Sequence, residues 1–211
     1  MILGHEIRGR GPRRVLVAHG WFGDHGVWAL AYPLLDEEAF TYVFPDYRGY
    51  GASRAIQGQH TIAEIAGDML ALADRLDWEH FALLGHSMGG MVAQRVAIDA
   101  PHRIRAAVCV PPVPASGVPL PADIAALFAS AATDDQAALG VIETSLGRRL
   151  APALTRLVLA HERSTAEPGA FAAYFHAFSK TDFSSEAGGL RAPLLVLVGE
   201  HDAGVSSDFV Q

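Results

Sequence analysis

The segment Gly85-His86-Ser87-Met88-Gly89 constrains the fold of this chain more than any other. It follows the apolar run Phe81–Leu84, which predicts a buried strand, and precedes a helical pattern over Met91–Ala100. Glycines two positions either side of a serine let strand and helix approach closely and place the serine on a sharp turn. The segment therefore predicts a strand–turn–helix unit that presents the Ser87 hydroxyl as a nucleophile. The alternative is a glycine-rich turn with an incidental serine.

Apolar runs alternate with helical patterns along the first 110 residues. We expect strands over Met1–Ile7, Arg14–Ala18, Phe40–Phe44, Phe81–Leu84 and Ala106–Val110. We expect helices over Trp28–Leu35, from a Thr61/Glu64 capping box to about Leu76, and over Met91–Ala100. This alternation predicts an α/β fold with a mostly parallel sheet and helices on both of its faces.

The pattern changes after Val110. Five prolines between positions 111 and 121 precede an alanine-rich helical stretch from Asp123 to about Ser179, with breaks near Thr133, Gly147 and Pro168. We expect about four short helices there. Residues 193–198 then return to the pattern of a buried strand. The simplest division is a core of residues 1–111 and 189–211 with a helical cap inserted at 112–188.

Charge and composition exclude several classes of function. The net charge is −7, and no basic stripe of the kind that nucleic-acid-binding proteins carry is visible. The arginines at positions 8, 10, 13 and 14 surround Gly9–Pro12 and indicate a solvated turn. No run of about 18 apolar residues predicts a membrane span. We therefore expect no nucleic-acid or membrane partner.

The single cysteine bears on location. Cys109 lies in an apolar run, so we expect a buried thiol, and one cysteine permits no internal disulfide. The first 20 residues contain His5, Glu6 and four arginines, which is unlike a signal peptide. These features favour a soluble, cytoplasmic protein. The sequence does not fix the oligomeric state.

Other chemistry-bearing residues follow the ends of expected strands. Asp202 comes just after the strand at 193–198, where an acid can orient a histidine; a turn-capping aspartate is the alternative. His19-Gly20-Trp21 follows an earlier strand, and His19 there suggests a residue that braces the loop. Asp46–Ser53 suggests a structural loop in which Asp46 and Arg48 can pair.

Motifs for metals and cofactors are absent from the sequence. There is no H-x-x-x-H or C-x-x-C spacing and no phosphate-binding glycine motif, so we expect neither a metal nor a cofactor. Six aromatic residues are candidates either for pocket lining or for ordinary packing: Trp28, Phe128, Phe171, Tyr174, Phe175 and Phe178.

The motifs His19–Trp21, Asp46–Ser53, Gly85–Gly90 and Gly199–Asp202, in this order, resemble the α/β-hydrolase superfamily. The resemblance implies catalytic roles for Ser87 and Asp202 and an oxyanion hole made by the backbone N–H groups of Trp21 and Met88. Within the superfamily, the serine nucleophile resembles that of esterases, lactonases, cofactor-free haloperoxidase-like enzymes and C–C bond hydrolases. Haloalkane dehalogenases and epoxide hydrolases of this superfamily have aspartate where this chain has Ser87, which disfavours them.

The resemblance also implies a histidine after the acid, and all ten histidines of this chain precede Asp202. We expect residues beyond 211 to belong to the protein; a complementing partner chain and an inactive truncated protein are the alternatives. The expected function is hydrolysis of a small carboxylic ester or lactone through an acyl-enzyme. Two alternatives remain open. One is a ligand-sensing or partner-binding protein on a hydrolase fold with little turnover, and the other is a C–C bond hydrolase anchored by arginines 148, 149, 156 or 163.

Overall fold

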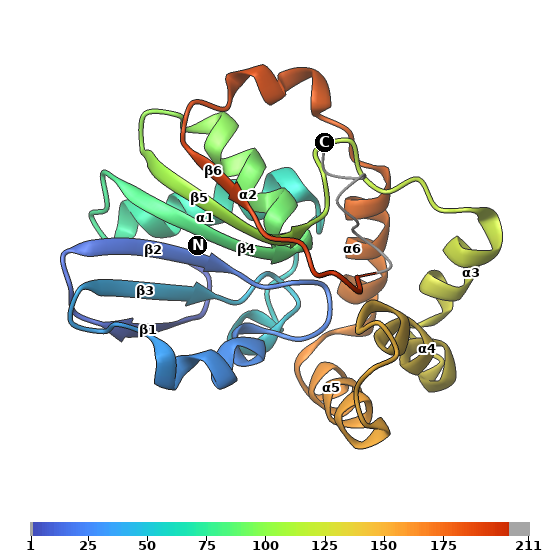
Figure 1. The fold of residues 1–211 in the computed structure, drawn as a ribbon. Helices are drawn as coiled ribbons and strands as arrows, with labels where there is room; N and C mark the ends of the chain where they lie inside the picture. The colour runs from blue at the N-terminus through green and yellow to red at the C-terminus, as the bar shows by residue number, and fades with distance from the viewer. Residues whose placement is uncertain (1, 203–211) are drawn as a thin grey trace.

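A six-stranded sheet forms the centre of the molecule, in the order β1-β3-β2-β4-β5-β6 (Figure 1). The computed structural model describes residues 2–202. The strands are β1 (His5–Gly9), β2 (Arg13–Ala18), β3 (Phe40–Pro45), β4 (Phe81–Ser87), β5 (Ile104–Pro112) and β6 (Leu194–Val196). All neighbouring pairs are parallel except β1, which runs antiparallel to β3. The expected α/β class and mostly parallel sheet are confirmed.

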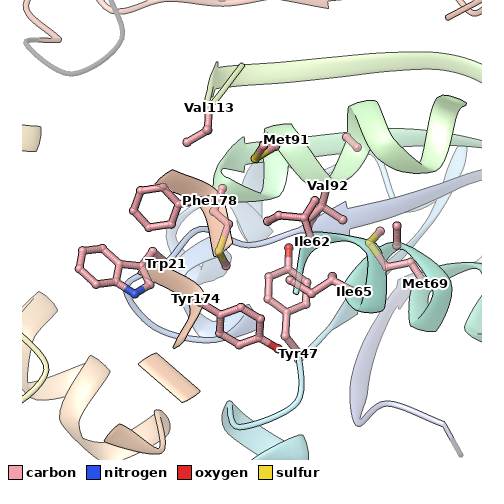
Figure 2. Close-up of a cluster of buried hydrophobic side chains, with 14 of the residues drawn as sticks. Trp21, Tyr47, Ile62, Ile65, Met69, Met91, Val92, Val113, Tyr174 and Phe178 are labelled. Carbon is pink, nitrogen blue, oxygen red and sulfur yellow. The ribbon is translucent and has the colours of Figure 1, made fainter. Parts of the chain in front are cut away.

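Two helices cover one face of the sheet. Helix α1 (Ile62–Arg75) begins at Thr61, whose Oγ accepts a hydrogen bond from the Glu64 amide at 3.1 Å. The other half of the expected capping box differs, because the Glu64 carboxylate accepts from the amides of Gln59 and His60. Helix α2 (Met88–Asp99) packs on β4, β5 and α1. Figure 2 shows Ile62 and Met69 facing Met91 and Val92 in this core.

A short helical segment covers part of the other face. Residues 25–34 form a 3₁₀ helix, η1 (His25–Leu34), where the sequence suggested a helix over 28–35. Trp28 and Tyr32 of η1 pack on a smaller buried cluster made by Val15, Val17 and Phe44 of β2 and β3. The core therefore has apolar contacts on both faces of the sheet.

The prediction that residues 193–198 form a buried strand is wrong in its burial. Strand β6 lies at the sheet edge and, within residues 2–202, pairs with β5 alone. Leu194, Leu195 and Leu197 are 41%, 54% and 46% exposed. An apolar run indicates that a segment is suited to burial, but within residues 2–202 no other element covers these leucines.

Four helices occupy the stretch between β5 and β6, as expected. They are α3 (Ala122–Ser130), α4 (Asp135–Ser145), α5 (Pro152–Thr165) and α6 (Pro168–Lys180), followed by the 3₁₀ helix η3 (Ser184–Gly189). Figure 1 shows α3 to α6 beyond the carboxyl ends of the parallel strands. Helix α6 starts at Pro168, where the sequence pattern predicted a break, and α5 starts at Pro152, five residues after the break expected near Gly147.

The structure bears on two further expectations, the burial of the cysteine and the absence of a membrane span. Cys109 is fully buried in β5. In the part of the chain that the structure describes, no helix combines the length and the apolar character that crossing a bilayer requires.

Candidate active site

Ser87 lies at the junction of β4 and α2 with φ 55° and ψ −120°. A positive φ at a non-glycine residue costs on the order of 1–3 kcal/mol and persists only where the surroundings enforce it. Glycines on both sides allow the close backbone packing that holds it here. A Cβ at Gly85 would overlap the carbonyl of Gly89, and one at Gly89 would lie 2.5 Å from the carbonyl oxygens of Ala18 and His19. The sharp strand–turn–helix expected from the sequence is present.

The loop after β2 lies directly against this turn. A Cβ at Gly20 would lie 3.4 Å from Cβ of Ser87. The next residue is fixed at both ends, because the Trp21 indole N–H donates to the carbonyl of Phe171 at 2.8 Å, and the Trp21 carbonyl accepts from the Tyr50 hydroxyl at 2.8 Å. The His19–Trp21 loop is thus held beside Ser87 by side chains from elsewhere in the fold.

Met88 is the first residue of α2 and is fully buried. The first amides of a helix lack partners within the helix and carry a partial positive charge. The N-terminus of α2 therefore supplies backbone donors at the same turn as Ser87.

His19 braces the loop through both ring nitrogens. Nδ1 lies 2.8 Å from the carbonyl oxygen of Gly20, and Nε2 accepts a hydrogen bond from the Tyr47 amide at 3.3 Å. The ring is fully buried and stacks on Tyr47 with centroids 3.8 Å apart. Burial lowers the pKa of His19 to about 4, so the ring is neutral at pH 7. This arrangement agrees with the bracing role expected from the sequence.

A pocket of about 340 Å³ opens at the carboxyl ends of the strands and is lined by Trp21, Ser87 and Asp202. Asp202 follows β6 in a turn closed by its amide, which donates to the Gly199 carbonyl at 3.1 Å. The structure therefore brings three of the four predicted site residues to one cavity, and the fourth, Met88, is the neighbour of Ser87. Glu200 and His201, expected to be exposed, are exposed.

His86 is a pocket residue that the sequence did not single out. It occupies the variable position before Ser87, and its ring lies edge-on to Trp28 with centroids 6.3 Å apart. Desolvation lowers the pKa of His86, and the Asp202 carboxylate acts in the opposite direction. Its titration is thus coupled to the same acid that lines the pocket.

The Asp46–Ser53 loop is structural, with one change of partner. Asp46 Oδ1 accepts from the His25 amide at 2.9 Å and from His25 Nδ1 at 2.7 Å, and its Oδ2 accepts from the Ala52 amide at 2.8 Å. The suggested pair between Asp46 and Arg48 is absent. Arg48 instead donates to both carboxylate oxygens of Asp68 on α1, at 2.7 and 2.8 Å. Both carboxylate oxygens of Asp46 already accept hydrogen bonds from His25 and Ala52, and Arg48 pairs with Asp68 instead.

Asp24, His25 and Asp46 form a group whose ligand-type atoms all lie within 4.8 Å of one another, which is compatible with a bound cation. They come from two loops, so spacing along the sequence does not reveal them. Their atoms already take part in hydrogen bonds: Asp24 Oδ1 accepts from the Gly26 amide at 2.8 Å and from His161 Nε2 at 2.9 Å. We interpret the group as a structural link between the loops.

The aromatic candidates divide between pocket and core. Phe128 and Phe178 line the pocket. Phe171, Tyr174 and Phe175 are buried in the main core, and Trp28 packs on the opposite face of the sheet. Figure 2 shows Trp21 beside Phe178, and both residues also line the pocket. Spacing along a helix identifies an apolar face but does not say which of its residues meet a cavity.

Comparison with known proteins agrees with this geometry. The family model described as alpha/beta hydrolase fold matches residues 13–175. The chain is 38% identical over 107 residues to the dihydrolipoyllysine-residue acetyltransferase component of the acetoin cleaving system of Cupriavidus necator, a match that covers 50% of this chain and 28% of that protein. It is 35% identical over 103 residues to a fluoroacetate dehalogenase from a Burkholderia species, covering 46% and 33%. The matches therefore span about a third of these relatives' own length.

A solved structure is similar over nearly the whole chain. A thermophilic esterase from Thermogutta terrifontis superposes with a TM-score of 0.74 at 27% identity, covering 98% of this chain and 78% of that one. The similarity extends through the four helices between β5 and β6 as well as the sheet.

Proposed function

Because this chain belongs to the alpha/beta hydrolase fold family, we propose that it is a serine hydrolase that cleaves a small carboxylic ester or lactone through an acyl-enzyme on Ser87. The observation that carries the proposal is the backbone of Ser87, held at φ 55° between β4 and α2 and open to a pocket that Asp202 also lines. Strain of this kind at a nucleophilic side chain has a mechanistic use, because it lifts the hydroxyl clear of the chain.

The proposed reaction proceeds in two acyl-transfer steps. Ser87 Oγ attacks the carbonyl carbon of the substrate as a base removes its proton, and the backbone N–H groups of Met88 and Trp21 stabilise the resulting oxyanion. The carbonyl re-forms as the C–O bond to the leaving alcohol breaks, and the alcohol takes up the proton. Water then attacks the acyl carbon as the base takes its proton, the C–O bond to Ser87 breaks as Oγ receives that proton, and the carboxylic acid is released. One oxyanion donor typically contributes about 3–4 kcal/mol.

The base is a histidine in this proposal, with Asp202 as the acid that orients it. The order implied by the family resemblance puts that histidine C-terminal to Asp202. His19 does not suit the role, because both of its ring nitrogens already bond to backbone groups of the loop.

We also propose that residues 112–188 act as a cap over a core made of residues 1–111 and 189–211. Helices α3, α4, α5 and α6 each contribute at least one side chain to the pocket that contains Ser87: Phe128, Val141, Val158 and Phe178. A substrate bound at Ser87 would contact these side chains, so the cap selects the substrate.

Dehalogenation is disfavoured although one relative is a fluoroacetate dehalogenase. The haloalkane dehalogenases of this superfamily have aspartate at the position where this chain has Ser87. C–C bond hydrolysis of a keto acid is disfavoured by a specific observation, because no arginine lines the pocket within residues 2–202. A ligand-sensing role is the remaining alternative.

Steady-state hydrolysis of p-nitrophenyl esters by the full-length protein tests the proposal. We expect turnover that Ser87→Ala reduces by at least about 10³-fold, as loss of a nucleophile does. The matched control is Ser116→Ala, because Ser116 is exposed and lies outside the pocket, and it should retain full activity. Tight binding of an ester with no more than one turnover would favour the sensing role, and equal activity of Ser87→Ala would refute the assignment.

A further inference from the structure

We infer that the acyl part of the substrate is uncharged and apolar, of about five to eight carbons, and that it binds among the cap helices. This inference rests on the proposed function and goes beyond it by naming the substrate class. Its grounds are the composition and the size of the pocket beside Ser87.

The pocket is polar at the strand ends and apolar elsewhere. Of its eighteen lining residues, four are polar. His86 and Ser87 end β4, and Asp202 lies in the turn that follows β6. The fourth, Ser145, is exposed at the end of α4. The remaining lining residues are apolar or glycine. A charged acyl chain would therefore lose its hydration on entering the pocket and gain no charged or polar partner from these walls. Such an unpaired transfer costs several kcal/mol.

The cap arginines lie elsewhere. Arg163 donates to Asp135 at 3.0 Å and to Glu162 at 2.8 Å, and Arg148, Arg149 and Arg156 are exposed. None of them is among the residues that line the pocket. A carboxylate on the acyl chain would thus find no Lys or Arg side chain among the described walls.

Aromatic packing fixes the shape of the apolar part. The Trp21 ring stacks on Phe171 with centroids 4.2 Å apart and runs parallel to Phe128 of α3 at 5.7 Å. Phe171 is fully buried, whereas Phe128 is partly buried and lines the pocket. Phe128 therefore forms a wall that is supported by Trp21, the residue whose backbone N–H is one of the two proposed oxyanion donors.

The volume sets the length of the chain. At about 30 Å³ for each water-sized group, 340 Å³ holds on the order of ten non-hydrogen atoms. The ester group and its leaving oxygen take part of that space, which leaves room for about five to eight carbons. Each buried methylene contributes about 0.8 kcal/mol, equivalent to roughly a four-fold gain in kcat/KM.

The test uses p-nitrophenyl esters of acetic, butyric, hexanoic, octanoic and dodecanoic acid, together with the adipic acid monoester, which carries a terminal carboxylate. We expect kcat/KM to rise by at least about 50-fold from acetate to hexanoate or octanoate and to fall at dodecanoate. The adipate monoester should react at least about ten-fold more slowly than the hexanoate ester. A flat series, a preference for acetate or equal use of the adipate ester would overturn the inference.

Two matched pairs of variants locate the effect. Val158→Arg places a cation in the pocket from α5 and should raise the adipate-to-hexanoate ratio at least ten-fold; Leu157→Arg, at a neighbouring residue that is 64% exposed, should leave it unchanged. Phe128→Ala should move the optimum to longer chains; Leu127→Ala, which is 38% exposed and outside the pocket, should not. Equal effects within either pair would contradict the proposed position of the acyl chain.

A binding measurement separates this inference from the proposed function. Straight-chain amides from acetamide to octanamide present the same acyl chains without an ester, and titration calorimetry measures their affinity for the full-length protein. If no ester is turned over but affinity rises with chain length, the proposed function fails and the pocket assignment stands. If esters are turned over through Ser87 with affinity independent of chain length, the pocket assignment fails alone.

Discussion

Nε2 of His161 lies 2.9 Å from Oδ1 of Asp24, joining helix α5 to the loop after β2 across 137 residues of sequence. The imidazole is closely seated, because a Cβ at Gly23 or at Gly26 would come within 2.8 Å of its ring. Asp24 is buried and also caps η1 through the Gly26 amide. This contact connects the helices that line the pocket to the loop that carries Trp21.

Loss of this contact should loosen the cap more than it weakens the fold. We expect His161→Ala to lower the free energy of unfolding by about 1 kcal/mol, since the side chain is 35% exposed, and to raise KM several-fold with a smaller change in kcat. Denaturant unfolding and ester kinetics measure the two quantities. His176→Ala, an exposed histidine on α6, is the control. An unchanged KM would show that the contact does not position the cap.

The buried His19 predicts a pH dependence of stability. Its pKa of about 4 in the folded protein lies below the ordinary value of 6.5, so the unfolded chain binds the proton more tightly. The contribution of the neutral His19 ring to the free energy of unfolding is complete above pH 6.5. About 3 kcal/mol of it is lost as the pH falls toward 4. The difference in unfolding free energy between wild type and His19→Gln, measured from pH 7.5 to 4, should shrink accordingly. A constant difference would contradict a neutral buried ring.

Two glycine substitutions should act in opposite directions. Gly89→Ala puts a Cβ 2.5 Å from two carbonyl oxygens and should destabilise the protein by about 1–3 kcal/mol and reduce activity. Gly140→Ala, within α4 and with open space around the new Cβ, should stabilise it by about 0.5–1 kcal/mol. Thermal unfolding of both variants tests the prediction, and a stable, active Gly89→Ala would contradict the tight packing at the Ser87 turn.

Cys109 should be unreactive in the native protein. Burial raises the pKa of its thiol to about 12, so almost no thiolate is present at pH 8. Ellman's reagent should therefore modify no thiol in the folded protein and one thiol per chain in guanidinium chloride. Rapid reaction of the folded protein would show that this strand is more accessible than the structure indicates.

Local signals in the sequence predicted the fold well. The glycines around Ser87 specify a sharp turn through backbone geometry alone, and Thr61 specifies the start of α1 through one hydrogen bond. Interactions over long distances were harder to predict. The partner of Arg48 depends on which carboxylates other donors have already taken, and the contact between His161 and Asp24 requires the fold to bring two distant segments together.

The burial of apolar segments also depended on long-range contacts that the sequence does not show. Strand β4 lies between β2 and β5, and its burial was predicted correctly. Strand β6 is as apolar in sequence, but within residues 2–202 it pairs with β5 alone and its leucines are exposed. The pocket-lining side chains of α4 and α5 were missed for a related reason. An apolar helix face looks the same in sequence whether it meets a core or a cavity.

Trapping the acyl-enzyme tests directly whether Ser87 is the nucleophile. The full-length protein is mixed with p-nitrophenyl hexanoate, quenched in acid within milliseconds and digested, and the acylated peptide is identified by mass spectrometry. We expect a burst of one p-nitrophenol per chain and a hexanoyl group on Ser87, with neither in Ser87→Ala. Turnover without a burst and without an adduct at Ser87, or an adduct on another residue, would contradict it.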